Sequence, residues 1–232
     1  MNALLLMMGG IGSRFGSAIP KQFTMVCDKP LFMHILEAYD RSGLVDRIVI
    51  VCNSDWIDVA KDYLNDYQTE SMVNIVHGGD TRSQSVRNGL FFIKDDTDEN
   101  ANILIHDTTH PYLDRDAVEK ALALMDDYDG VTLCQREYDT CYLIDDENVL
   151  SEIPKKSVVS GASPEIFRFG NLFKIYSEST DEELGKMSSA GALALSRGLR
   201  FGYVPMSILN IKITMPEDME LYRNLISSYY FR

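Results

Sequence analysis

Short apolar runs alternate along the chain with longer stretches in which apolar residues recur at helical spacing. A short apolar run is typical of a buried strand, whereas a period of about 3.6 residues predicts an amphipathic helix. The strands predicted in this way are residues 4–8, 47–52, 73–76, 103–105 and 210–214. The predicted helices lie near residues 31–41, 55–67, 84–93, 114–125, 164–177 and 181–197, and Pro216 opens a last one.

This strand–loop–helix order predicts an α/β fold with a Rossmann-like, mostly parallel twisted sheet flanked by helices on both faces. Ligands of such sheets bind beyond the carboxyl ends of the strands, so we expect the chemistry in the loops after Met8, Val76 and Ile105. Residues 132–160 have an extended pattern with turn residues at 145–148, which predicts a β-arm at about 134–160. We find no repeat or linker, so residues 1–232 are expected to form one domain with this arm.

The charge balance restricts the partners of the chain. Its formal net charge is -13, from 22 basic and 35 acidic residues among 232. Nucleic acids and anionic membranes select basic surfaces, so neither is an expected partner. No apolar run reaches the roughly 18 residues that a membrane span needs. A polyanionic substrate would therefore require a local basic pocket within an acidic envelope.

The cysteines point to a reducing compartment. Cys27, Cys52, Cys134 and Cys141 contain no Cys-x-x-Cys pair and have no histidine cluster nearby. A zinc site or a disulfide framework is therefore not expected.

The N-terminus has no basic leader, and its apolar residues run straight into Gly9 and Gly10, which favours a first buried strand over a secretory signal. We expect a cytoplasmic protein.

A glycine-rich loop follows the first predicted strand. Residues 9–16 read Gly-Gly-Ile-Gly-Ser-Arg-Phe-Gly, and Pro-Lys-Gln-Phe follows at 20–23. The last glycine, Gly16, comes one residue too late for the dinucleotide fingerprint, and the Walker pattern is absent. The loop can nevertheless form a backbone nest for phosphate, with Arg14 and Lys21 as fixed cations beside it. The alternative is a tight turn with two surface cations.

Three further positions carry candidate chemistry. A second glycine turn at 78–79 leads into a helix start that bears Arg82, Ser83 and Ser85, which suits an anion, or simply an N-cap made by Ser83. Asp107 follows the fourth strand and is placed to hold Mg²⁺ against phosphate oxygens, although a lone Asp is more often a turn residue. Lys212 interrupts an apolar stretch, where a lysine is costly unless it is paired or used.

These stretches, in this order, resemble the CTP-dependent cytidylyltransferase family that acts on 2-C-methyl-D-erythritol 4-phosphate and on ribitol 5-phosphate. The carrying motifs are Gly-Ile-Gly-Ser-Arg with Pro-Lys-Gln-Phe, Gly-Gly-x-x-Arg-x-x-Ser-Val, the His-Asp turn at 106–107, Asp139-Thr140, and Asn210-Ile211-Lys212. Each motif is weak alone, but the ordered set is specific and spans nearly the whole chain. The resemblance implies a nucleotidyltransferase that joins CTP to a polyol or sugar phosphate and releases pyrophosphate.

The resemblance also implies a role for each matching position. The catalytic residues would be Arg14, Lys21 and Lys212, and Asp107 would hold Mg²⁺. The nucleotide would be bound by Gly9, Gly10, Gly12, Ser13, Gly79, Arg82, Ser85 and Asp107, with Gly79, Arg82 and Ser85 at the cytosine end. The acceptor would meet His110, Thr140 and a lysine of the arm, Lys155 or Lys156. Such enzymes form homodimers through the arm, whose basic residue reaches the neighbouring site.

The arm and the stretch at 53–56 resemble the ribitol-phosphate branch more than the methylerythritol branch. Several positions depart from the family: His110 stands where arginine is usual, Glu165 where glutamine is usual, and Ser189 and Leu209 near positions that usually carry an acid. A changed acceptor, such as another polyol phosphate or a phosphonate, would explain these departures. So would a nucleotide-binding paralogue with little turnover. An oxidoreductase of Rossmann type is disfavoured by the glycine spacing.

Overall fold

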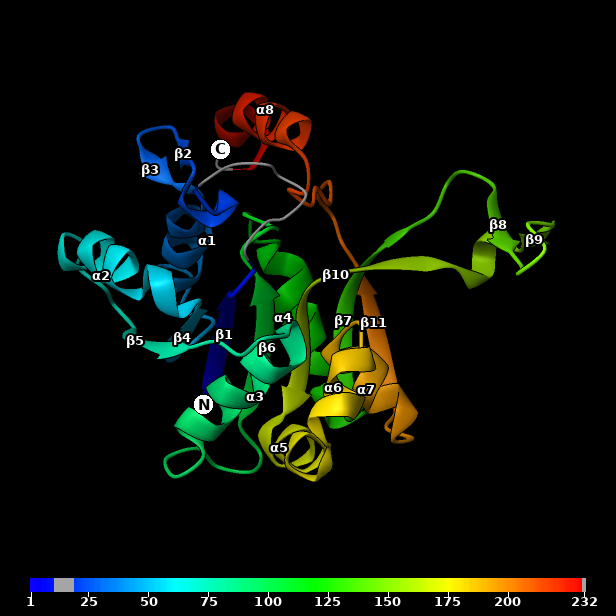
Figure 1. Ribbon diagram of the computed structural model, residues 1–232, viewed down its shortest axis with the longest axis horizontal. Helices are drawn as coiled ribbons and strands as arrows, with labels where there is room; N and C mark the ends of the chain where they lie inside the picture. The colour runs from blue at the N-terminus through cyan, green and yellow to red at the C-terminus, as the bar shows by residue number, and fades with distance from the viewer. Residues whose placement is uncertain (11–18, 231–232) are drawn as a thin grey trace.

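The computed structural model describes residues 1–10 and 19–230, which fold around one central seven-stranded sheet (Figure 1). Along the sheet the strands are ordered β11-β7-β10-β6-β1-β4-β5. Their bounds are β1 (Asn2–Met8), β4 (Arg47–Cys52), β5 (Met72–His77), β6 (Asn102–Asp107), β7 (Gly130–Arg136), β10 (Val159–Arg168) and β11 (Phe201–Pro205). The mostly parallel α/β fold expected from the sequence is confirmed.

The strand pairing gathers the functional loops at one edge of the sheet. β1 pairs in parallel with β4 and β6, β4 with β5, and β11 with β7. β10 lies antiparallel between β6 and β7. All strands except β10 therefore have their carboxyl ends at the same edge, which is where ligands of such sheets bind.

Alternating side chains along β1 explain why helices cover both faces. Leu4, Leu6 and Met8 enter one cluster with residues of α1 and α4, and Leu5 enters a second cluster with residues of α3 and α5. Side chains alternate between the faces of a strand, so a continuous apolar run such as this one must be buried on both. The helices are α1 (Leu31–Asp40), α2 (Ile57–Asn65), α3 (Arg82–Ile93), α4 (Arg115–Ala123), α5 (Phe169–Glu178), α6 (Asp181–Lys186), α7 (Ala190–Ser196) and α8 (Pro216–Leu225).

A third, smaller cluster lies under the last helix, at the carboxyl edge of the sheet (Figure 1). Pro216 opens α8 as predicted, and the helix continues into a π-helical turn at Ile226–Tyr230. Ile211 and Ile213 pack in this cluster against Tyr222 and Ile226. A short hairpin, β2 (Met25–Val26) and β3 (Lys29–Pro30), joins the same region through Val26.

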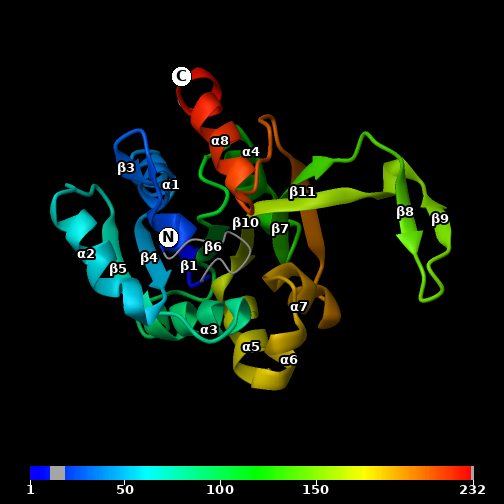
Figure 2. The ribbon, with the colours of Figure 1, turned by 45° about the horizontal axis from the view of Figure 1, so that its top comes forward.

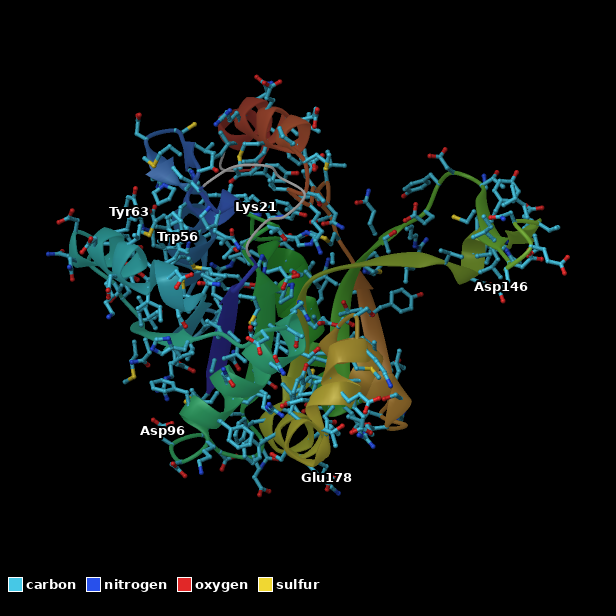
Figure 3. All side chains as sticks on the ribbon, in the orientation of Figure 1. Lys21, Trp56, Tyr63, Asp96, Asp146 and Glu178 are labelled. Atoms are coloured by element: carbon cyan, nitrogen blue, oxygen red, sulfur yellow. The ribbon has the colours of Figure 1, made fainter. Side chains whose placement is uncertain are left out.

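The predicted β-arm is present and projects from the body of the molecule in both ribbon views (Figures 1 and 2). Its outer part is an antiparallel hairpin of β8 (Cys141–Ile144) and β9 (Leu150–Ile153). Asp145 caps the intervening turn by accepting hydrogen bonds from the backbone amides of Glu147 and Val149. Figure 3 places Asp146 at the tip of the arm and Lys21 on the body.

The predicted strand at 210–214 is wrong. Within the described residues, 206–214 pairs with no strand, and the unpredicted strand β11 precedes it. The apolar alternation that suggested a strand exists because Ile211 and Ile213 are buried against α8 and not within the sheet. The amide of Met206 donates to the carbonyl of Cys134 in β7, and beyond it side chains and the loop carbonyl of Thr109 bind the backbone of this segment.

Two helix predictions also need correction. Residues 164–168 belong to β10, and the helix begins only at Phe169. Pro164 fits in this strand because the pairing with β7 shifts register between Gly161 and Glu165, and prolines in sheets are found at such bulges. The predicted helix 181–197 is two helices, since the Ser189 hydroxyl caps a new one by accepting from the amide of Ala192.

Candidate active site

Asp107 is the centre of the charged cluster at the carboxyl edge. It ends β6, and its side chain is 17% exposed. Arg82 Nε donates to its Oδ1 at 2.9 Å, and Lys212 Nζ lies 3.8 Å from its Oδ2. Burial raises the pKa of Asp107, but the charges of Arg82 and Lys212 outweigh it and hold the pKa below its usual range. Residues from β6, α3 and the late segment thus meet at one carboxylate.

Glu165 completes the cluster from the other side. It lies on β10 opposite Ile105, so it shares a sheet face with Asp107. Its Oε2 is 3.6 Å from Arg82 Nη2, and its Oε1 accepts from the amide of Gly191 at 2.8 Å. A Cβ at Gly191 would lie 2.7 Å from that oxygen, so only glycine fits there. Burial lowers the pKa of Arg82, but the charges of Asp107 and Glu165 raise this pKa by more than burial lowers it and keep the guanidinium charged.

Lys21 joins the opening loop to the late segment. It begins a 3-10 turn at Lys21–Phe23, and its Nζ donates to the carbonyl of Ile213 at 2.7 Å. The neighbouring Gln22 is buried and donates to the carbonyl of Gly10 at 2.9 Å. Lys21, Gly10 and the segment that bears Lys212 therefore lie at the same edge of the sheet, as a shared phosphate pocket requires.

The second glycine turn meets the first one at Ser85. Thr81 caps α3 in a capping box with Gln84, so the predicted cap by Ser83 is wrong and Ser83 is buried. Ser85 Oγ accepts from the amide of Gly79 at 3.0 Å and donates to the carbonyl of Thr81 at 2.9 Å.

Both glycines approach their neighbours closely. A Cβ on Gly79 would lie 2.5 Å from the Cβ of Gln84, and one on Gly9 would lie 3.1 Å from Ser85 Oγ. The loops after β1 and β5 therefore form one surface.

His110 is a buried neutral residue behind this cluster. Its Nδ1 is 2.8 Å from Asn210 Oδ1, which also accepts from the Tyr112 hydroxyl. Burial lowers the pKa of His110 to about 3 and that of His106, whose Nε2 bonds the His110 carbonyl at 2.7 Å, to about 4. The imidazole of His110 thus adds no positive charge for an acceptor phosphate near neutral pH.

Not every predicted residue joins this cluster. Gly12, Ser13 and Arg14 lie outside the described residues. Thr140, Lys155 and Lys156 lie on the arm, which leads away from the end of β6 (Figure 1). Lys155 Nζ donates to the carbonyl of Tyr138 at 3.1 Å. In one chain, the arm residues therefore lie apart from Asp107.

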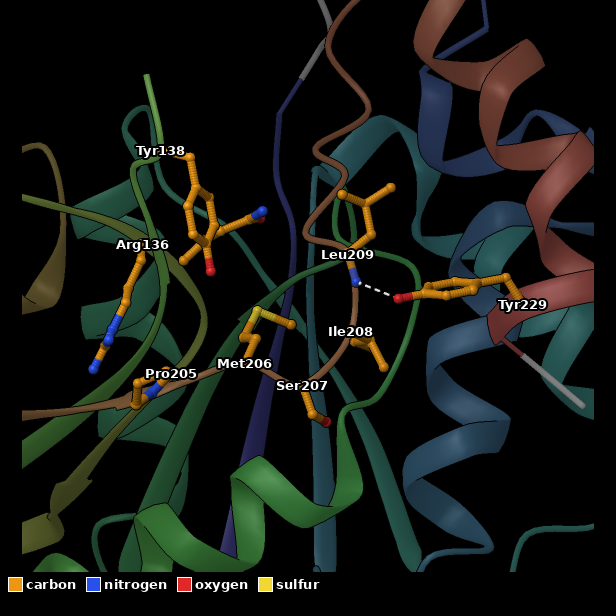
Figure 4. A pocket seen from close by; sticks show the side chains of 9 residues that line it. Arg136, Tyr138, Pro205, Met206, Ser207, Ile208, Leu209 and Tyr229 are labelled. Atoms are coloured by element: carbon orange, nitrogen blue, oxygen red, sulfur yellow. Dashed lines mark hydrogen bonds between the residues drawn. The ribbon is translucent and has the colours of Figure 1, made fainter. Parts of the chain in front are cut away.

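A cavity of about 460 Å³ opens beside the late segment at the foot of the arm (Figure 4). Its lining comes from the end of β7, the segment after β11 and the C-terminal turn, and comprises Gln135, Arg136, Tyr138, Pro205, Met206, Ser207, Ile208, Leu209 and Tyr229. Asp107 and Lys212 do not line it, so it adjoins the charged cluster without containing it.

The residues at the carboxyl edge of the sheet fit a magnesium ion that binds together with the phosphates of the nucleotide. Among residues 1–10 and 19–230, no group of three or more His, Cys, Asp or Glu side chains could hold a metal. Mg²⁺ typically takes one or two carboxylates together with substrate phosphates and water. Asp107 can supply one such carboxylate: its Oδ1 accepts from Arg82, whereas its Oδ2 lies 3.8 Å from Lys212, beyond hydrogen-bond distance.

Sequence reasoning missed several residues of the site. Glu165 was noted only as a departure, because its burial, which marks a charge that needs a partner, is seen only in the structure. Gln22 could have been found from its place beside Lys21 in the opening motif. Tyr112, Tyr229 and Tyr230 carry no local signal, because only the fold brings them to the late segment.

The chain is similar to known proteins over nearly its whole length. Residues 3–227 match the family described as IspD, 2-C-methyl-D-erythritol 4-phosphate cytidylyltransferase. A ribitol-5-phosphate cytidylyltransferase of Lacticaseibacillus paracasei is 25% identical over 96% of this chain and 97% of its own. A 2-C-methyl-D-erythritol 4-phosphate cytidylyltransferase of Thermotoga neapolitana is 29% identical over 96% of both.

The fold has close structural neighbours. The crystal structure of 4-diphosphocytidyl-2C-methyl-D-erythritol synthase from Anaerococcus prevotii superposes with a TM-score of 0.80 at 22% identity, and the match covers 97% of each chain. None of the described helices has both the length and the apolar character that crossing a membrane requires.

Proposed function

Because this chain belongs to the IspD family of cytidylyltransferases, we propose that it transfers the cytidylyl group of CTP to ribitol 5-phosphate, giving CDP-ribitol and pyrophosphate. The observation that supports this most directly is the meeting of Arg82 and Lys212 at Asp107, with Lys21 bound to the carbonyl of Ile213 beside Lys212 at the carboxyl edge of the sheet. The acceptor rests on the likeness to ribitol-5-phosphate cytidylyltransferases and on the arm sequence.

In the proposed reaction an oxygen of the acceptor phosphate attacks the α-phosphorus of CTP. A new P–O bond forms, the bond to the β-phosphate oxygen breaks, and pyrophosphate leaves. The attacking oxygen is already ionised at neutral pH, so no general base is needed. The protein's part is in-line positioning and neutralisation of phosphate charge.

Each element contributes one part of this arrangement. The backbone at Gly9, Gly10 and Gly79 would lie beside the phosphates and the base, and Lys21 and Lys212 would supply positive charge at the reacting phosphate. Arg82 orients Asp107, which would hold Mg²⁺. When bound, the ion would neutralise charge on the triphosphate. Arg14, predicted to act with Lys21, lies outside the described residues.

The arm supports a homodimer in which one chain completes the site of another. Its hairpin exposes large apolar side chains, among them Tyr142, Leu143, Ile144 and Leu150, each more than half exposed. Two-stranded hairpins are marginally stable alone in water, so a hairpin of this kind needs a partner surface. Lys155 or Lys156 would then reach the partner's acceptor site, and Thr140 lies on the same arm. The cytoplasmic location stays a prediction.

A pyrophosphate-release screen tests the proposal. CTP, ATP, GTP and UTP are crossed with ribitol 5-phosphate, 2-C-methyl-D-erythritol 4-phosphate, other polyol phosphates and small phosphonates, with and without Mg²⁺. The expected result is Mg²⁺-dependent release that requires CTP and is fastest with ribitol 5-phosphate. Faster turnover of the methylerythritol compound would assign the chain to that activity, and CTP binding without turnover on any acceptor would contradict the proposed reaction.

A further inference from the structure

The segment that carries Lys212 is bound to a strand at its first residue, where the amide of Met206 donates to the carbonyl of Cys134 in β7 at 2.8 Å. Among the described residues, 206–214 forms no ladder with any strand, yet Lys212 must be placed within reach of Asp107. Ile211 and Ile213 are buried on one side of this extended segment, so Lys212 projects from the other side. The position of Lys212 therefore depends on what fixes the backbone at each end of the segment.

At its far end the backbone is fixed by the site itself. The amide of Ile213 donates to the carbonyl of Thr109 at 2.8 Å, and its carbonyl accepts from Lys21. Both partners belong to loops at the carboxyl edge of the sheet. This end of the segment is therefore tied to the loops after β1 and β6.

At its near end the backbone is held first by Asp114, whose carboxylate accepts from the amides of Ser207 and Ile208, and then, at Leu209, by the C-terminal turn. The amide of Leu209 donates to the hydroxyl of Tyr229 at 2.9 Å, a contact drawn in Figure 4. The hydroxyl of Tyr230 donates to the carbonyl of the same residue at 2.7 Å. Two consecutive side chains from one helical turn thus satisfy both backbone groups of Leu209.

The ring of Tyr230 extends the contact to the next residue. It stacks on Tyr112 with ring centres 4.6 Å apart and planes 8° from parallel. The Tyr112 hydroxyl donates to Asn210 Oδ1, which also meets His110. The C-terminal turn therefore holds the segment both directly, at Leu209, and through Tyr112, at Asn210.

We propose that Tyr229 and Tyr230 form a C-terminal clamp that positions Lys212 for nucleotidyl transfer by fixing the backbone of Leu209. They are positioning residues, because they act through the segment and touch neither substrate in the arrangement proposed above. The inference rests on the proposed function, since it assigns Lys212 a place at the reacting phosphates. It adds to that function a requirement for the end of the chain, which lies outside the glycine loops and the sheet.

The test removes hydroxyls while keeping the rings. Tyr229→Phe, Tyr230→Phe and the double variant are compared with Tyr128→Phe, a matched control. The Tyr128 ring packs against Arg200 and Gly202 at the amino-terminal edge of β7 and β11. With the best acceptor from the screen, each clamp variant should lose about fivefold in kcat/KM for the acceptor, the effect of one neutral hydrogen bond. The KM for CTP should stay within about twofold of wild type, and the control should match wild type.

A double-mutant cycle separates positioning from general stability. In a Lys212→Ala background, the Tyr230→Phe change should have little further effect, because the clamp then has no lysine to place. Hydrogen exchange adds a readout independent of turnover: the peptide covering 206–214 should exchange faster in Tyr229→Phe, with exchange in the sheet unchanged.

The outcomes distinguish the two proposals. Equal activity of Lys212→Ala and wild type would remove the proposed mechanism itself. Two outcomes would overturn the clamp and leave the proposed function standing, provided that Lys212→Ala loses activity. In the first, the fold-losses in kcat/KM of a clamp substitution and of Lys212→Ala multiply in the double variant. In the second, the clamp substitutions change neither turnover nor the exchange of 206–214. A loss in Tyr128→Phe equal to that of the clamp variants would also overturn the clamp.

Discussion

The two buried histidines behind the active site predict a steep loss of stability in mild acid. An unfolded histidine titrates near pH 6.5, whereas burial lowers the pKa of His106 to about 4 and that of His110 to about 3. Between these values the unfolded chain binds protons that the folded chain does not. The free energy of unfolding is therefore highest above about pH 6.5 and falls as the pH drops toward 4, as expected for groups whose pKa is lower in the folded than in the unfolded state.

The expected loss is a large fraction of ordinary protein stability. Each histidine contributes roughly 1.4 kcal/mol per pH unit in this window. From pH 6.5 to 5 the loss is thus about 2 kcal/mol for each histidine and about 4 kcal/mol for the pair, against a typical total of about 5–15 kcal/mol. The depressed pKa of Asp107 does not change the loss between pH 6.5 and 5, because the stability that Asp107 contributes is lost only below pH 3.8, the ordinary pKa of its carboxyl.

Two measurements check this. Urea unfolding at pH 7, 6 and 5 gives the stability directly, and proton NMR titration of the histidine rings gives the protonation of each one. The chain has only 4 histidines, and a His77→Asn variant assigns the exposed ring. The signals of His106 and His110 should remain those of neutral imidazole down to pH 5. Titration of either ring near pH 6.5, or equal stability at pH 7 and 5, would refute the reasoning.

Three further perturbations have expected outcomes. Lys212→Ala should lower kcat about 100-fold or more in the pyrophosphate-release assay, since it removes charge from the reacting phosphates while Asp107 remains paired with Arg82; turnover equal to wild type would contradict the assigned role. Gly191→Ala should cost about 1–3 kcal/mol in urea unfolding, because the added methyl collides with Glu165 and Phe201. Ser85→Ala should cost about 1–3 kcal/mol by leaving the amide of Gly79 without its acceptor, and calorimetry should show weaker CTP binding.

The sheet and its edge could be predicted from the sequence because their signals are local. A buried parallel strand appears as a continuous apolar run, and the glycine and acidic residues that follow Met8, Val76 and Ile105 are placed by the strands before them. Asp107 and Lys212 could be linked only through the family resemblance, because their contact spans two elements distant in sequence.

The errors have a common physical cause. Ile211 and Ile213 show the alternation of a strand, but their partners are side chains of α8, and periodicity reports only that one side is buried, not what buries it. Residues 164–168 show an apolar pattern compatible with either a helix or a strand, and pairing with β6 and β7 decides the matter. The tyrosines of the C-terminal turn could not be predicted, because their hydroxyls bind backbone atoms about 20 residues away.

The antiparallel placement of β10 limits how the arm can change in length. The same strand that leaves the arm at Val159 places Glu165 opposite Ile105, on the face of the sheet that bears Asp107. A single inserted or deleted residue at the root would turn Glu165 to the opposite layer and separate it from Arg82. The turn at 145–149 has no such constraint, since the two strands that it joins, β8 and β9, pair only with each other. Among relatives, insertions and deletions should therefore collect at the tip of the arm and be excluded from its root.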